Sequence, residues 1–69
     1  CLTRRQAEVL YWMAQGKRDR EIAVILGMSP RTAETHVRAI LGKLGVETRA
    51  AAVAKAYRLW PAVVAAPPT

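Results

Sequence analysis

Apolar residues recur at helical spacing along most of the chain, and no stretch alternates apolar and polar residues as a strand would. The pattern is clearest over residues 30–44, which carry an apolar stripe of Ala33, Val37, Ile40, Leu41 and Leu44. The opposite face is polar or small and carries Arg31, Glu34, Thr35, Arg38 and Gly42. The sequence therefore predicts an all-α fold in which this helix packs on one side and leaves the other in solvent.

Helix-capping residues divide the chain into four predicted helices, over residues about 3–15, 19–26, 30–44 and 48–60. Thr3 and Gln6 are spaced as a capping box, and Gly16 follows the first helix as its left-handed stop. Thr48 is placed to cap the fourth helix, which Pro61 is expected to end. Residues 1–60 are thus predicted to form one domain of four helices, followed by a flexible tail over residues 61–69.

The segment Gly27-Met28-Ser29-Pro30 separates the second and third helices. Glycine permits a left-handed turn, serine is a good N-cap, and proline is tolerated at the first position of a helix. The second helix is expected to bury Ile22, Ala23, Ile25 and Leu26. Two helices joined by so short a turn predict a helix-turn-helix.

Length and composition exclude most kinds of site. The 69 residues suffice for one small core, leave no room for a cofactor-binding fold or an interdomain cleft, and include one cysteine (Cys1) and one histidine (His36). A disulfide framework, a cysteine-based zinc site and an unaided histidine metal site are therefore not expected, nor is any cofactor or enzymatic activity. No apolar run is long enough to span a membrane. The start at Cys1, without an initiator methionine, suggests a fragment of a longer protein.

The net charge of +6 is compatible with nucleic acid as a partner, although many soluble domains carry a similar charge. A helix fits the major groove of DNA, where exposed side chains read base edges. Arg38 can donate two hydrogen bonds to guanine, Thr35 can meet a base or a phosphate, and Glu34 can accept from cytosine. The plain alternative is that these three residues form an ordinary solvated helix face.

Contacts to the DNA backbone have more candidates. The start of the 30–44 helix offers amide groups and the positive end of the helix dipole to a phosphate. The candidates are, in order, Arg18, Arg20, Arg31, Thr32, His36, Lys43 and Arg49. Each of the charged residues taken singly is also compatible with a solvated surface position.

Several blocks of this sequence resemble the LuxR/FixJ-type (GerE-like) DNA-binding domain. These blocks are Leu2-Thr3-Arg4-Arg5-Gln6-Ala7-Glu8-Val9-Leu10, Glu21-Ile22-Ala23, Leu26-Gly27-Met28-Ser29, Thr32-Ala33-Glu34-Thr35-His36-Val37, Lys43-Leu44-Gly45-Val46 and Thr48-Arg49-Ala50. The resemblance covers residues 2–59. It implies a four-helix domain that reads bases through residues Glu34, Thr35 and Arg38 and contacts phosphates near Thr32, His36 and Lys43.

The same resemblance implies pairing of two domains on DNA through the 48–60 helix, with Val53, Ala56, Tyr57 and Trp60 as interface candidates. Simple core packing of this alanine-rich helix is the alternative. The chain departs from the family pattern at Glu34, where Lys, Asn or Gln is frequent, and at Arg18, where Ser or Thr often caps the second helix. Asp19 is expected to take over that cap.

The function implied is sequence-specific binding of double-stranded DNA by the C-terminal output domain of a bacterial transcription regulator. Such a domain is expected in the bacterial cytoplasm, on the nucleoid, as a homodimer on DNA, with RNA polymerase as a further partner. A receiver or other sensor domain would precede it, as in a response regulator. A protein-interaction module on the same fold, contacting RNA polymerase or a regulatory partner, is the alternative. A σ-factor region-four-like domain accounts less well for residues 43–49.

Overall fold

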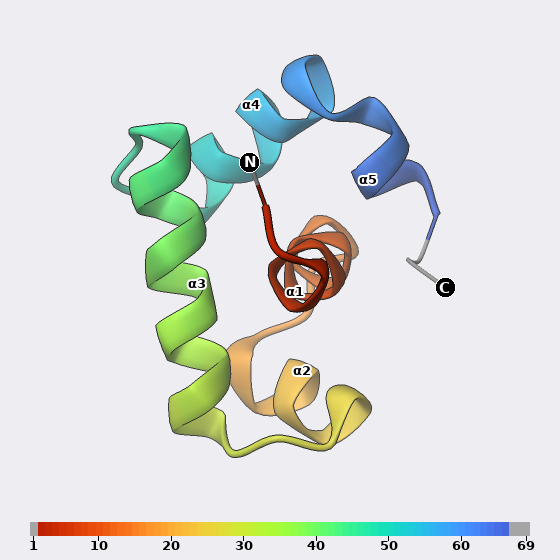
Figure 1. The fold of residues 1–69 in the computed structure, drawn as a ribbon, viewed down its shortest axis with the longest axis vertical. Coiled ribbons are helices and arrows are strands. Elements are labelled where there is room, and N and C mark those ends of the chain that lie inside the picture. The colour runs from red at the N-terminus through yellow and green to blue at the C-terminus, as the bar shows by residue number, and fades with distance from the viewer. Residues whose placement is uncertain (1, 67–69) are drawn as a thin grey trace.

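The computed structural model describes residues 2–66, and within them the chain is helical with no strand. The helices are α1 (Arg4–Ala14), α2 (Asp19–Leu26), α3 (Pro30–Leu44), α4 (Arg49–Leu59) and α5 (Pro61–Ala65). Figure 1 shows α3 along one side of the molecule, α2 at one of its ends, α4 at the other and α1 between them. The predicted all-α class and the first four helices are confirmed to within one or two residues.

Three helices, α1, α3 and α4, begin where a side chain of the preceding residue accepts a hydrogen bond from an amide of the first turn. Thr3 Oγ1 accepts from the Gln6 amide at 3.1 Å, while Gln6 Oε1 accepts from the Thr3 amide at 3.2 Å. The predicted capping box is therefore present. Thr48 caps α4 in the same way, because its Oγ1 accepts from the Ala51 amide at 3.1 Å.

The start of α2 differs from the prediction that Asp19 would be its cap. Arg18 is the residue before the helix, and its amide donates to Glu21 Oε1 at 2.8 Å. Asp19 is instead the first helical residue, where a negative charge favours the helix dipole. Its carboxylate is therefore available to a partner outside α2.

One continuous core lies between the helices. Its buried apolar side chains are Val9, Leu10, Met13, Ile22, Ala23, Ala33, Val37, Ile40, Leu44, Ala52, Ala56 and Val64. The predicted stripe on α3 is confirmed, with Leu41 partly buried at its edge. Ile25 was expected inside but is 43% exposed, because it lies about 100° around α2 from the centre of its buried face. Val24, further round, is 83% exposed.

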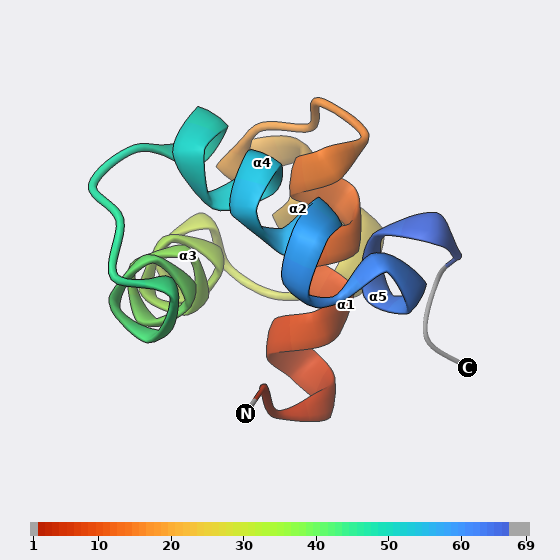
Figure 2. The same cartoon turned by 90° about the horizontal axis from the view of Figure 1, so that it is seen from above.

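The predicted flexible tail is in part a fifth helix. Pro61 does end α4, but it also occupies the first position of α5, where a missing N–H group costs nothing. Val64 is only 2% exposed, and Figure 2 shows α5 beside α1, with which it is in contact. The sequence therefore predicted four helices where the described chain has five. Residues 67–69 of the predicted tail lie outside the described residues.

A substitution in α5 should show whether this helix is part of the folded unit. Val64→Ala is expected to destabilise the domain by about 1.5 kcal/mol, since it removes two buried carbon atoms. The matched control is Val24→Ala, which changes an exposed side chain and should alter the free energy of unfolding by less than about 0.5 kcal/mol. Urea denaturation followed by far-UV circular dichroism measures both. Equal midpoints for the two variants would mean that α5 contributes nothing to stability.

Candidate nucleic-acid interface

The helix-turn-helix expected from the sequence is formed by α2 and α3, which pack against each other. Gly27 lies in the left-handed region with φ 68°. Because glycine has no Cβ atom, the chain can turn there without steric strain. Ser29 Oγ then accepts from the Thr32 amide at 3.1 Å and begins α3. The buried stripe of α3 is held by α1, α2 and α4, and Figure 1 shows its other side facing away from them.

All five residues of the predicted polar face of α3 are exposed, namely Arg31, Glu34, Thr35, Arg38 and Gly42. Arg38 Nη2 and Glu34 Oε2 are 3.9 Å apart, with side chains 77% and 52% exposed. So long and exposed an ion pair holds neither group firmly. Thr35 Oγ1 donates to the Arg31 carbonyl at 3.0 Å, which leaves the lone pairs of the hydroxyl oxygen able to accept.

Some hydrogen-bonding groups in the first turn of α3 already have partners within the domain. The Thr32 amide and hydroxyl both meet Ser29 Oγ, the two oxygens lying 2.9 Å apart. Arg31 and Thr32 are nevertheless exposed at the positive end of the helix dipole. A phosphate placed there would meet the dipole and a guanidinium, while the Thr32 amide is already donating.

The remaining phosphate candidates differ in their exposure and in what their side chains contact. Arg18 and Arg20 are exposed at the start of α2, and His36 is half-buried on α3. Lys43 is exposed on the last turn of α3, where its Nζ donates to Gln6 Oε1 of α1 at 2.7 Å. Lys43 therefore also ties α3 to α1.

Arg49 differs from the other candidates because its guanidinium is directed into the domain. Nη1 donates to Asp19 Oδ1 at 2.5 Å, and Nη2 donates to the Lys17 carbonyl at 2.6 Å. The sequence pattern placed Arg49 near a helix end but could not show that Asp19, thirty positions earlier, lies opposite it.

The residues of α4 that were predicted to pair two domains differ in their exposure to solvent. Ala56 has no exposed area and belongs to the core, so it cannot contact a second copy, and its prediction as an interface residue is wrong. Val53 and Trp60 are half-buried and pack against the core. Tyr57, 52% exposed, keeps a surface to offer. Leu59, 53% exposed, was missed because α4 lacks a clear apolar stripe that would show which side faces solvent.

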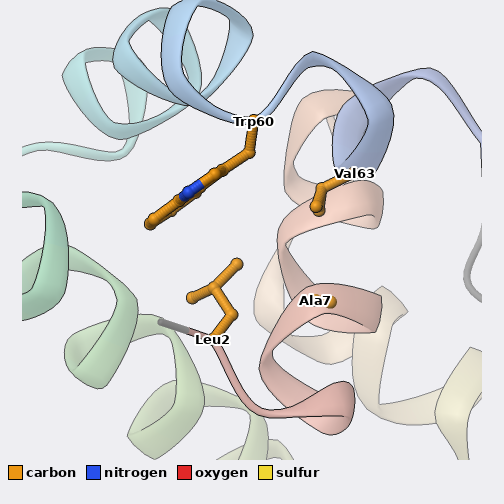
Figure 3. A pocket seen from close by; sticks show the side chains of 4 residues that line it. All are labelled: Leu2, Ala7, Trp60 and Val63. Atoms are coloured by element: carbon orange, nitrogen blue, oxygen red, sulfur yellow. The ribbon is translucent and has the colours of Figure 1, made fainter.

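Trp60 contributes to packing within the domain. Together with Leu2, Ala7 and Val63 it lines a small open apolar pocket between the start of the chain and the α4–α5 junction. Figure 3 shows these four side chains around the pocket. Trp60 therefore packs α4 and α5 toward α1, which is the core-packing alternative for this helix.

The described part of the chain offers no cluster of three His, Cys, Asp or Glu residues able to hold a metal ion. Among the described helices, none has the length and apolar character needed to cross a membrane.

Comparison with known proteins places this geometry in a family. The family model described as "Bacterial regulatory proteins, luxR family" matches residues 1–56. The HTH-type quorum sensing-dependent transcriptional regulator RpaR of Rhodopseudomonas palustris is 48% identical over 58 residues, covering 84% of this chain and 24% of that protein. The nitrate/nitrite response regulator protein NarP of Escherichia coli is 43% identical over 51 residues, covering 74% of this chain and 24% of that protein.

Solved structures agree with the sequence comparisons. The structure "VqmA bound to DPO" superposes with a TM-score of 0.88 at 26% identity, covering 99% of this chain and 33% of that one. The chain thus spans about a quarter of the length of these curated relatives and a third of the solved protein. Its helix-turn-helix, its core and these matches agree: the chain belongs to the LuxR family of bacterial regulatory proteins, which is not an enzyme family.

Proposed function

We propose that this domain binds double-stranded DNA sequence-specifically by placing α3 in the major groove. The observation that carries the proposal is the separation of the two faces of α3. One face is buried against the other helices, while Arg31, Glu34, Thr35 and Arg38 are all exposed on the other. A helix held rigidly along one side, with hydrogen-bonding side chains on the other, is the element that major-groove recognition requires.

Base reading falls to the middle of the exposed face. Arg38 can donate two parallel hydrogen bonds to guanine O6 and N7, since its ion pair with Glu34 is long and solvated. Thr35 can accept a hydrogen bond from a base edge, and Glu34 can accept from the amino group of cytosine. Phosphates would be met by Arg18 and Arg20 at the start of α2 and by Arg31, Thr32, His36 and Lys43 on α3.

Two domains would pair on DNA through α4, as the resemblance implied, but through a smaller set of residues. Tyr57 is the most exposed residue of the predicted set, since Val53 and Trp60 are half-buried and Ala56 is buried, and Leu59 adds a second exposed apolar side chain. Paired domains would read two half-sites about one helical turn apart. The residues that the domain buries in its own core support α4 without touching the second copy.

The relatives are transcriptional regulators, and this chain matches about a quarter of their length. We propose that the domain is the C-terminal DNA-binding part of a bacterial regulator acting in the cytoplasm on the nucleoid, joined to a sensor or receiver domain. RNA polymerase is the further partner expected of such a regulator once it is bound beside a promoter.

The salt dependence of binding tests the proposal. If three or four phosphates are neutralised per domain, the logarithm of the association constant should fall with the logarithm of salt concentration with a slope of about −3 per domain. Fluorescence anisotropy with labelled duplexes selected from a random pool measures this slope. Binding to none of the selected duplexes, or binding that is insensitive to salt, would contradict the proposal.

A protein-interaction module is the second candidate, favoured by one specific observation. Val24 and Ile25 are exposed side by side on α2, and with Lys17, Arg20 and Glu21 they line an open groove. Exposed apolar residues flanked by charges are typical of contact sites. The titration above separates the two candidates, because a domain serving protein contacts alone would lack strong, salt-dependent retention on duplex DNA or heparin.

A further inference from the structure

Arg49, the first residue of α4, connects two helices that do not otherwise pack together. Its Nη1 and Nη2 donate to Asp19 Oδ1 at 2.5 Å and to the Lys17 carbonyl at 2.6 Å, at the start of α2. Among the described residues, no Cα atom of α2 lies within 8 Å of a Cα atom of α4. The guanidinium therefore bridges a gap, along a shallow cleft that Arg18 and Arg20 also line.

The bridge requires arginine in particular. A guanidinium presents several donors in a rigid plane, so it can serve a carboxylate and a carbonyl at once. A lysine ammonium at the same position is a point charge on a flexible stem and lacks this planar fork. The Arg49 and Asp19 side chains are 38% and 32% exposed, so water screens the pair only in part.

The helix itself does not explain a cation at this position. The first residue of α4 lies at the positive end of that helix dipole, where a positive charge is unfavourable. Asp19, at the equivalent position of α2, is favourably placed and compensates it. The two charges are thus arranged for each other, and a DNA phosphate approaching Arg49 would compete with Asp19.

The Arg49 hydrogen bonds join the two ends of the segment that contains the helix-turn-helix. This segment, residues 19–49, runs from the start of α2, through the turn and α3, to the start of α4. Because α2 packs against α3, holding the start of α2 also limits how α3 can tilt relative to α4. If α4 carries the pairing contacts, this tilt sets the angle at which each α3 meets its half-site.

We infer that Arg49 is a positioning residue that holds α2 and α3 in place relative to α4, rather than a ligand of DNA phosphate. The inference rests on the proposed DNA-binding function and refines it. Arg49 resembles the other basic residues near helix ends in sequence and differs from them in what its guanidinium contacts.

Four variants of the whole chain test this assignment: Arg49→Gln, Arg49→Lys, Asp19→Asn and the double variant Asp19→Asn/Arg49→Gln. Each single change is expected to weaken binding to the selected duplex by about 1.5-fold to 5-fold, the range usual for a partly exposed ion pair. The double variant should bind about as well as Arg49→Gln alone, because both changes remove the same contact. The slope of affinity against salt should match that of the unaltered domain.

The matched control is Arg20→Gln, which changes an exposed arginine lining the same cleft. Because Arg20 is a proposed phosphate ligand, its replacement should reduce the steepness of the dependence of log affinity on log salt concentration by about one. A similar drop for Arg49→Gln would overturn the inference, as would wild-type affinity for Arg49→Lys or tighter binding by Asp19→Asn. All affinities are taken at a temperature where circular dichroism shows every variant folded, so that partial unfolding does not imitate a positioning effect.

Hydrogen exchange of the free domain separates the inference from the proposed function. Amides of residues 19–26 should exchange faster in Arg49→Gln than in the unaltered domain, while those of α1 should not change. If the unaltered domain binds no duplex, the DNA-binding proposal fails, and the exchange result alone then decides whether Arg49 holds α2. Unchanged exchange over residues 19–26 would overturn the inference whatever the DNA result.

Discussion

Arg38→Ala is expected to weaken binding to the preferred duplex by about 1–3 kcal/mol, or roughly 5-fold to 150-fold. The reason is that a bidentate contact to guanine is lost and nothing nearby on α3 can replace it. Specificity should relax at the same base pair, so that duplexes altered there bind the variant nearly as well as the preferred one. Anisotropy titrations against the preferred duplex and the three duplexes substituted at that base pair measure both effects.

Arg31→Ala is the matched control for this change, since it removes an arginine from the same exposed face of the same helix. Arg31 lies on the first turn of α3, where a phosphate contact is proposed. Its loss should weaken all duplexes alike and reduce the salt slope by about one. If Arg38→Ala discriminates among bases as sharply as the unaltered domain, Arg38 has no base-reading role.

Leu10→Ala is expected to have the largest effect on stability, lowering the free energy of unfolding by about 2–5 kcal/mol. The side chain has no exposed area and is one of the largest fully buried side chains in the core formed by the five helices. A domain of this length has a total stability of only about 3–10 kcal/mol, so the variant should lose a large part of it and unfold at a clearly lower temperature. Thermal and urea unfolding followed by circular dichroism give the midpoint and the free energy.

Leu59→Ala provides the comparison, because it is the same change at a side chain that is 53% exposed on α4. Its free energy of unfolding should change by no more than about 0.5–1 kcal/mol. Similar midpoints for the two variants would contradict the core assignment. DNA binding by Leu10→Ala should fall in proportion to the folded fraction, whereas Leu59→Ala should keep single-site binding and lose affinity for paired half-sites.

Most of the fold was predictable because the signals that set helix boundaries are local. The Thr3–Gln6 capping box, the Gly27 turn and the Ser29 cap each involve residues a few positions apart, which the sequence displays directly. The two faces of α3 follow equally from its period. The site was therefore predictable as far as it consists of one helix face.

Where sequence prediction failed, the outcome depended on packing between distant segments. Ile25 and Ala56 are both apolar and both helical, yet the first is exposed and the second is buried. Because α2 has only eight residues, its sequence pattern does not define how far the buried face extends around the helix. In α4, alanines occur on several sides, so the pattern does not show which face packs against the core. Val64 is buried because α5 reaches α1, and the local pattern around Pro61 carries no trace of that contact.

The sequence by itself determined the first four helices, the turn and the polar face of α3, since capping, turn formation and amphipathicity depend on neighbours within a few residues. The tertiary structure alone decided which basic residues face outward. Arg31 and Arg49 both stand near helix starts, but only for Arg49 does folding bring a carboxylate from thirty residues away within hydrogen-bonding distance. A charge is satisfied by whatever lies nearest in space, and distance in space is set by the packing of the whole domain.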